Sequence, residues 1–151
     1  MFDLRRLSDA EVSLLSAFDC PTRRRWQRDA RRIIRSIELA IDEDDRNISV
    51  YGHLNDLGLV SVAAVEPIEL GWNLIVLGVA DGDGGHGLAG ELLEFAIADC
   101  FAIDPRVVVW EVHRQNHEML RVCQKLSFVG EPDPDDSEFT LFQVEASGDG
   151  R

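Results

Sequence analysis

The sequence lacks both an apolar run of membrane-spanning length and an apolar segment at its start. None of its 151 residues lies in a stretch approaching the roughly 20 apolar residues that a transmembrane helix needs. The first twelve residues, MFDLRRLSDAEV, contain no apolar core of the kind found in secretory signals. We therefore expect no membrane span and no export signal. The length and the 45% hydrophobic content predict a single domain over residues 1–151.

Cysteine is also scarce. The only cysteines are Cys20, Cys100 and Cys123, an odd number placed far apart in the chain. This spacing favours neither a disulfide framework nor a zinc site. Free thiols are typical of a reducing compartment, so the sequence predicts a cytoplasmic protein without a metal site.

Positive charge is sparse and unevenly placed. Fifteen basic residues stand against 28 acidic ones, and the net charge is −13. Such a chain is poorly suited to neutralising nucleic-acid phosphates, and its acidic body attracts a cationic substrate such as an amine. The arginines concentrate over residues 23–35. That stretch is interpreted either as a solvated face that pairs with the protein's own acids, or as a surface for RNA or an acidic partner.

The hydrophobic pattern predicts a mixed α/β (α+β) chain, with strands and helices in the order β-α-α-β-β-β-α-β-α-β-β. Ser8 and Glu11 have the spacing of a capping box, which predicts a helix over residues 9–18. Residues 72–80 (WNLIVLGVA) are nearly all apolar and predict a strand buried on both faces. The other expected strands are 2–7, 48–54, 58–66, 106–113, 138–145 and one from 128 onward, and the other expected helices are 21–41, 88–101 and 116–126.

A glycine-rich loop, DGDGGHG over residues 81–87, joins the apolar strand to the next helix. Glycines let the backbone approach a ligand closely, and the free amides at the start of a helix favour an anion. A phosphate or pyrophosphate is therefore the expected ligand. Residues 85–90 match GxGxxG, but they do not follow the first strand of a βαβ unit, which argues against a Rossmann domain. The GK[ST] of a P-loop and the acids of a calcium loop are absent. A turn without a ligand remains the alternative.

This loop and the segment over residues 110–128 (WEVHRQNHEMLRVCQKLSF) together resemble the GNAT acetyltransferase superfamily. The family's phosphate loop reads Q/R-x-x-G-x-G/A after a central strand, and its later motif has a strand, an Asn that opens a helix, and K-x-G-F. Here Gly82 stands at the Q/R position, and no Lys or Arg lies between residues 72 and 101. The resemblance implies a mostly antiparallel, twisted sheet of six to seven strands flanked by about four helices.

The resemblance further implies that acetyl-CoA binds as co-substrate between two diverging strands. Backbone around Leu77, Gly78 and Val79 would pair with pantetheine, loop and helix amides would hold the pyrophosphate, and Asn116 would meet the pantetheine arm. The implied phosphate-binding residues are Gly84, Gly85, His86, Gly87, Leu88 and Ala89.

An acetyl transfer to an amine needs a base for the ammonium and an acid for the leaving thiolate. Glu111 and His113 share one face of their strand and are the base candidates, with Glu66 and Glu69 as weaker alternatives. Cys123 stands where the family often has its general-acid Tyr. Its thiol is either that acid or a small buried hydrophobic group.

The resemblance thus implies an acetyl-CoA-dependent N-acetyltransferase that acts on an amine of a small molecule or a protein. A non-catalytic binding module with the same fold is the main alternative, and a toxin-like enzyme that acetylates tRNA is a lesser one. The sequence leaves the acceptor and a homodimer open.

Overall fold

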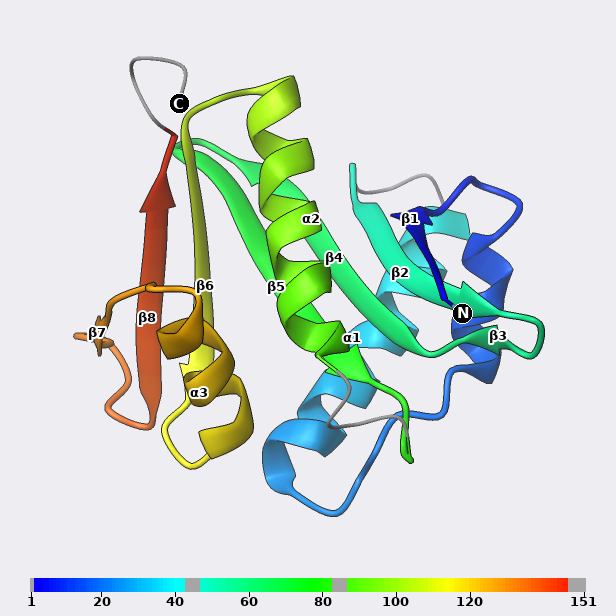
Figure 1. Cartoon of the computed structure of the whole chain (residues 1–151), viewed down its shortest axis with the longest axis horizontal. Helices are drawn as coiled ribbons and strands as arrows, with labels where there is room; N and C mark the ends of the chain where they lie inside the picture. Colours follow the sequence, from blue (N-terminus) through cyan, green and yellow to red (C-terminus); the bar gives the residue numbers. More distant parts are fainter. Residues whose placement is uncertain (1, 43–46, 83–86, 147–151) are drawn as a thin grey trace.

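One twisted eight-stranded sheet runs through the molecule, in the order β1-β2-β4-β5-β6-β8-β7, with β3 paired to β2 (Figure 1). The computed structural model describes residues 2–42, 47–82 and 87–146. All neighbouring strands are antiparallel except β5 and β6. The strands are β1 (Asp3–Arg6), β2 (Ser49–Asn55), β3 (Gly58–Leu59), β4 (Ser61–Ile68), β5 (Gly71–Val79), β6 (Val107–His113), β7 (Gly130–Pro132) and β8 (Phe139–Glu145). The mixed, mostly antiparallel fold is confirmed.

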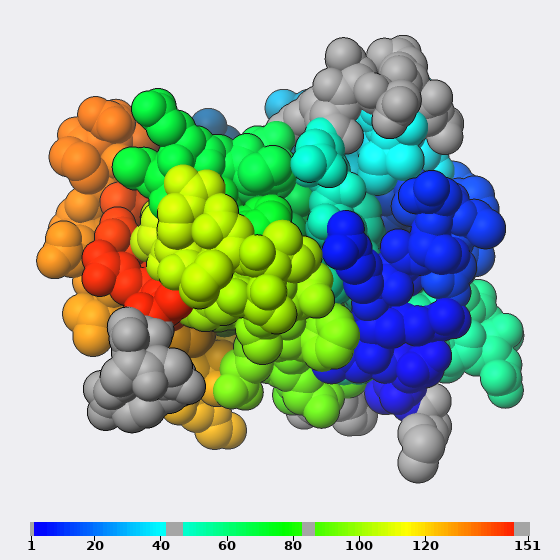
Figure 2. Space-filling view, turned by 90° about the horizontal axis from the view of Figure 1, so that it is seen from above, coloured from blue at the N-terminus to red at the C-terminus, as the bar shows by residue number. Residues whose placement is uncertain are grey.

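Helices cover both faces of this sheet. In the described residues they are the 3-10 helix η1 (Val12–Ala17), α1 (Arg25–Asp42), α2 (Leu88–Ile103) and α3 (His117–Lys125). α1 and η1 pack on one face, and α2 and α3 pack on the other (Figure 1). Figure 2 shows α2 across the middle of its face, between the first and last segments of the chain. No helix in the described ranges is long and apolar enough to cross a membrane.

Alternating side chains of β4 divide between two hydrophobic cores. Ala63 and Val65 pack under α2, whereas Val62 and Ala64 pack under α1. This period of two is what a strand covered on both faces requires.

The first predicted helix, over residues 9–18, is wrong in length and type. The Ser8 amide does donate to Glu11 Oε1 at 3.0 Å, as in a capping box, but only the 3-10 helix Val12–Ala17 follows. Val12 and Leu15 are the two buried side chains of this segment. Such a short apolar stripe supports only two 3-10 turns against the sheet.

β5 and β6 run parallel and pair at two positions only, Trp72 with Val108 and Asn73 with Val109. Beyond them β5 continues beside β4 as far as Val79. The two parallel strands therefore diverge toward their carboxyl ends. The expectation that residues 72–80 are buried on both faces is wrong for the far half of β5, where residues 77–79 are only partly buried.

A β-bulge at Ile75 changes which face the later residues of β5 present. Ala64 of β4 pairs with Val76, whereas Val65 pairs with Leu74, so Ile75 is the extra residue. Consequently Leu74 packs under α2, Val76 under α1, and Leu77 again toward α2. The bulge thus sets the orientation of the segment of β5 that borders the space between the diverging strands β5 and β6.

Gly71, which opens β5, lies tightly against β6. A Cβ atom here would lie within van der Waals overlap of the Val107 backbone, and the φ of +155° also disfavours a side chain. We expect Gly71→Ala to lower the free energy of unfolding by about 3 kcal/mol, because backbone on both sides must move. Urea denaturation measures this. Gly90→Ala in α2 is the control, because a Cβ atom there would lie at an ordinary contact distance of 3.7 Å from the Val122 side chain. This variant should stabilise the fold by about 0.5–1 kcal/mol. Equal stability of the two variants would contradict the expectation.

Candidate active site

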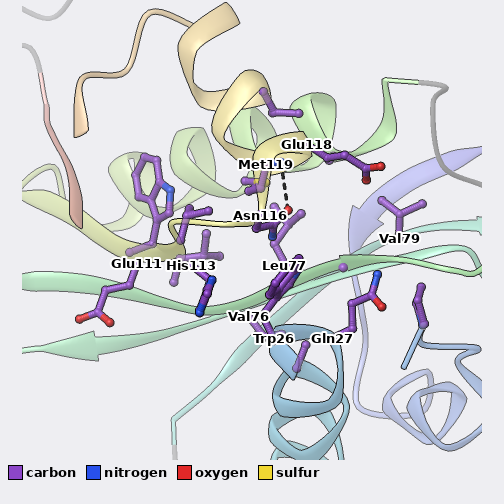
Figure 3. A pocket seen from close by; sticks show the side chains of 18 of the residues that line it. Trp26, Gln27, Val76, Leu77, Val79, Glu111, His113, Asn116, Glu118 and Met119 are labelled. Atoms are coloured by element: carbon purple, nitrogen blue, oxygen red, sulfur yellow. Dashed lines mark hydrogen bonds between the residues drawn. The ribbon is translucent and has the colours of Figure 1, made fainter. Parts of the chain in front are cut away.

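The diverging strands open a groove of about 1830 Å³ that reaches from one face of the sheet to the other. It is lined by residues from α1 and the segment before it, from β5 and β6, from the start of α2 and from α3. Figure 3 shows Asn116 and Met119 on the α3 side of β5, with Trp26 and Gln27 of α1 on the other side. Two surfaces from opposite faces of the sheet therefore meet at one place, which suits a reaction between two substrates.

The β5 side of the groove presents backbone. Leu77, Gly78 and Val79 all line it, and within the described residues β6 pairs with none of them. A strand edge without a partner can pair with an extended ligand through its N–H and C=O groups. These are the three residues for which the family resemblance implies a pantetheine contact.

The start of α2 closes one end of the groove. Gly87 is the N-cap residue, with φ of 75° and no capping side chain, and Leu88 and Ala89 form the first turn beside it. First-turn amides without a side-chain cap are available to an anion. Gly84, Gly85 and His86, also predicted for this site, lie outside the described residues.

Asn116 occupies the start of α3, where the sequence expects it. Its side-chain carbonyl accepts a hydrogen bond from the Met119 amide at 3.3 Å, which caps the helix (Figure 3). Asn116 also lines the groove. Because the cap holds its carbonyl end, the amide NH₂ is the donor that this residue offers to a ligand.

Glu111 of β6 lines the groove on the face of the sheet that α1 covers. Glu111 is an exposed residue, but desolvation of its carboxyl raises the pKa to about 7, and a hydrogen bond with Asp133 and the charges of Asp133, Asp136 and Asp135 add to the effect. Asp133 keeps its own charge because its carboxylate accepts from the Asp135 amide at 2.9 Å, which lowers the Asp133 pKa. Of the pair, Glu111 therefore takes the proton, and it titrates where a general base is most effective.

His113 is held between two aromatic rings. Its imidazole stacks on Trp26 with ring centroids 5.0 Å apart. It also packs against the Phe139 ring in a T-shaped arrangement, with ring centroids 5.5 Å apart. Nδ1 lies 3.2 Å from the Gln115 amide and accepts its hydrogen. The lone pair of a neutral imidazole that could take a substrate proton is thus already engaged. These contacts favour Glu111 over His113 as the base, and they make His113 part of a wall of the groove.

Cys123 lies in the core, away from the groove. Its side chain is 0% exposed and packs in the cluster that contains Trp110 and Phe142. Burial raises the pKa of its thiol. Its neighbours Val122 and Gln124 line the groove, but Cys123 does not. The structure therefore favours the buried-hydrophobe interpretation of this residue over the general acid.

We expect Cys123→Ala to cost about 1 kcal/mol of stability and to change the rate per folded molecule less than about threefold. The measurement combines melting temperature with kcat for an amine substrate. Cys100→Ala is the matched control, because Cys100 is another fully buried thiol of the same core. A large rate loss in the Cys123 variant alone would restore the general-acid role.

Two residues of the site carry no local sequence signal of their role. Trp26 is expected only as part of the apolar stripe of its helix, yet it borders the groove and stacks on His113. Asp133 is assigned only to a turn, yet it raises the pKa of Glu111. Each acts through a partner distant in the chain, which a local pattern does not reveal. The weaker base candidates Glu66 and Glu69 do not line the groove.

Comparisons of this chain with known proteins find no match by sequence and many matches by structure. No family model matches the chain, and no curated protein matches it in sequence. Many solved structures match in fold. One is the PaiA N-acetyltransferase from Thermoplasma acidophilum in complex with coenzyme A, at 16% identity and a TM-score of 0.74, covering 96% of this chain and 99% of that chain.

Two further neighbours agree with it. The ribosomal-protein-S18-alanine N-acetyltransferase from Escherichia coli is 14% identical with a TM-score of 0.71, covering 97% of this chain and 95% of that one. A GNAT-family acetyltransferase from Staphylococcus aureus Mu50 is 11% identical with a TM-score of 0.74, covering 97% and 100%. At identities this low, the similarity establishes the fold alone. The chain therefore adopts the fold of the GNAT N-acetyltransferases.

Proposed function

We propose that the protein is an acetyl-CoA-dependent N-acetyltransferase that moves an acetyl group to an amine. The observation that carries the proposal is one groove with a free strand edge and an uncapped helix start on one side and a carboxyl of pKa about 7 on the other. The first two features suit the pantetheine and phosphates of a CoA thioester, and the third suits an amine acceptor.

The residues present fit a CoA thioester. Leu77, Gly78 and Val79 offer backbone to pantetheine, and Asn116 offers its amide donor nearby. At Gly87 a Cβ atom would meet none of the described residues within 4 Å, so none of them blocks the approach to the first amides of α2. When bound, acetyl-CoA supplies an activated thioester carbonyl.

Glu111 acts on the acceptor. Its carboxylate takes a proton from the ammonium, directly or through a water, and the freed nitrogen lone pair attacks the thioester carbonyl. The attacking nitrogen gives its surplus proton to water, the C–S bond breaks to expel the CoA thiolate, and the neutral amide remains. Since Cys123 is buried, we assign protonation of the thiolate to solvent water.

Beyond Arg25, which lies toward the acceptor end, the groove borders an acidic surface around Glu111. Glu111 lies beside Asp133, Asp135 and Asp136, and the whole chain carries −13. A cationic amine is drawn to such a surface and stabilised there before it loses its proton. We therefore propose a cationic amine, of a small molecule or of a protein, as the acceptor.

The test pairs two measurements on one preparation. Calorimetric titration with acetyl-CoA measures binding, and release of free CoA in the presence of a panel of primary amines measures turnover. We expect binding and amine-dependent release. Binding without release for any amine would favour the non-catalytic module, and absence of binding at high micromolar acetyl-CoA would overturn the proposal.

A further inference from the structure

The strand and helix that border the phosphate end of the groove supply no cation, although Arg121 and Lys125 of α3 also line the groove. Residues 72–101, which include β5 and most of α2, contain no Lys or Arg. Asp81, two residues beyond the end of β5, adds a negative charge to the same groove. CoA carries a pyrophosphate and a 3′-phosphate, so a binding site made of amides alone would face an uncompensated repulsion.

A cation reaches this end from a distant part of the sequence. Nη2 of Arg23, in the segment before α1, lies 3.1 Å from Oδ1 of Asp81. Arg23, Asp81, Gly82 and Gly87 all line the groove together. The Arg23 side chain is 73% exposed. Its guanidinium has five N–H donors in a fork that matches phosphate oxygens, and the contact with Asp81 occupies only part of it.

The backbone around Arg23 is braced. Nη1 of Arg28 donates to the carbonyl oxygens of Thr22 and Arg23, at 3.1 and 3.4 Å. The Arg24 amide donates to the side chain of Gln27 at 2.9 Å. These bonds hold the segment in place at the N-terminus of α1, so Arg23 is presented to the groove from a defined position.

The same segment is also joined to the end of β5. The Asp81 amide donates to the carbonyl oxygen of Asp19 at 2.9 Å. With this backbone bond already present, an exposed ion pair between Arg23 and Asp81 adds little as a structural link, because such pairs stabilise a fold weakly. The position of Arg23 is better explained by a ligand that shares it.

We propose that Arg23 is a phosphate-binding cation of this protein, and that Asp81 holds its guanidinium at the groove before CoA binds. This inference rests on the proposed function, because it needs a CoA thioester in the groove. On binding, the phosphate replaces or joins Asp81 as the anionic partner of Arg23. The cation that the loop lacks is thus supplied from the segment that precedes α1.

The test measures the dissociation constant of CoA by calorimetry at low salt for the wild type, Arg23→Gln and Asp81→Asn. We expect Arg23→Gln to weaken CoA binding about tenfold to hundredfold, as loss of a charge-assisted contact with phosphate does. Asp81→Asn should tighten it several-fold, because it removes a repelling charge and frees Arg23. Added salt should shrink both differences.

Arg25→Gln is the matched control. Arg25 is also a groove-lining, mostly exposed arginine, but it pairs with Glu138 at 3.4 Å, toward the acceptor end. We expect its CoA affinity to match that of the wild type. Dephospho-CoA then identifies the phosphate: if Arg23 binds the 3′-phosphate, the Arg23→Gln effect disappears with this ligand, and if it binds the pyrophosphate, the effect persists.

Other results overturn the inference. Unchanged CoA affinity in both Arg23→Gln and Asp81→Asn would leave the ion pair as a structural contact only, while the wild-type binding would still uphold the proposed function. An equal loss with Arg25→Gln would show a non-specific effect of charge. If the wild type itself binds no CoA, the proposed function and this inference fail together. If Arg23→Gln does not fold, the change in CoA affinity of Asp81→Asn decides between the two outcomes.

Discussion

Replacing Glu111 by glutamine should lower kcat by about 10²–10⁴-fold, the usual contribution of a general base, while acetyl-CoA affinity stays close to that of the wild type. The glutamine keeps the shape and polarity of the side chain but cannot accept the ammonium proton. Glu111 projects on the face of the sheet covered by α1, away from the helix start that we assign to the phosphates. Steady-state kinetics and calorimetry on the same variant separate the two effects.

The pH dependence of kcat/KM follows from the raised pKa of Glu111. Below about pH 7 the folded protein holds this carboxyl protonated, so the base is absent. The rate should therefore rise with pH through about pH 7 and level off above it. Asp133→Asn removes the charge and the hydrogen bond that hold the proton on Glu111, so the rise should move to lower pH. Glu131→Gln, a nearby acid outside the groove, should leave the profile in place.

The same shift predicts an effect on stability. A carboxyl whose pKa is higher in the folded than in the unfolded state favours folding at low pH, and that contribution is lost as pH rises through the folded value. Glu111→Gln should therefore raise the melting temperature relative to the wild type at pH 8, with little difference at about pH 4, below the pKa of Glu in the unfolded chain. An unchanged rate together with an unchanged melting temperature would exclude Glu111 as the base.

Gly87→Asp should abolish measurable binding of acetyl-CoA while the fold survives. A Cβ at this position meets no atom of the described residues within 4 Å, so the carboxylate can extend into the groove at the start of α2. There it competes with a phosphate for the first amides of the helix and repels it by charge. Asp tolerates the left-handed φ of 75° better than most residues with a side chain, so the backbone cost is small.

Two variants separate charge from backbone strain in this experiment. Gly87→Asn has nearly the same shape without the charge and should bind acetyl-CoA more tightly than Gly87→Asp. Gly58→Asp places the same residue at another glycine of positive φ, +126°, with open space around it and outside the groove, and it should bind like the wild type. Wild-type affinity in a folded Gly87→Asp variant would remove the start of α2 from the binding site.

Local patterns in the sequence determined much of this protein. The apolar stripe of α1, the buried run of β5 and the alternation of β6 each depend on neighbours within a few residues, so their periodicity predicts the element. Asn116 caps α3 as expected, since a cap involves only the next helical turn. The order of these elements and the resemblance of two motifs were sufficient to predict the fold class.

The tertiary structure alone decided which side chains meet. The bulge at Ile75 and the early separation of β5 from β6 depend on pairing across the sheet, which no local pattern contains. Cys123 and Val122 are neighbours with the same local sequence. Cys123 is buried because it packs in the cluster that contains Trp110, whereas Val122 lines the groove.

The chemistry of the site depends on contacts between residues distant in the chain. The pKa of Glu111 depends on Asp133, which another strand brings beside it. Arg23 reaches Asp81 across 58 residues. Desolvation and charge act through space over a few ångströms, so they follow the folded positions of atoms and not their order in the sequence. For that reason the sequence could name candidates for the base and the phosphate site, but their contacts and relative positions come from the fold.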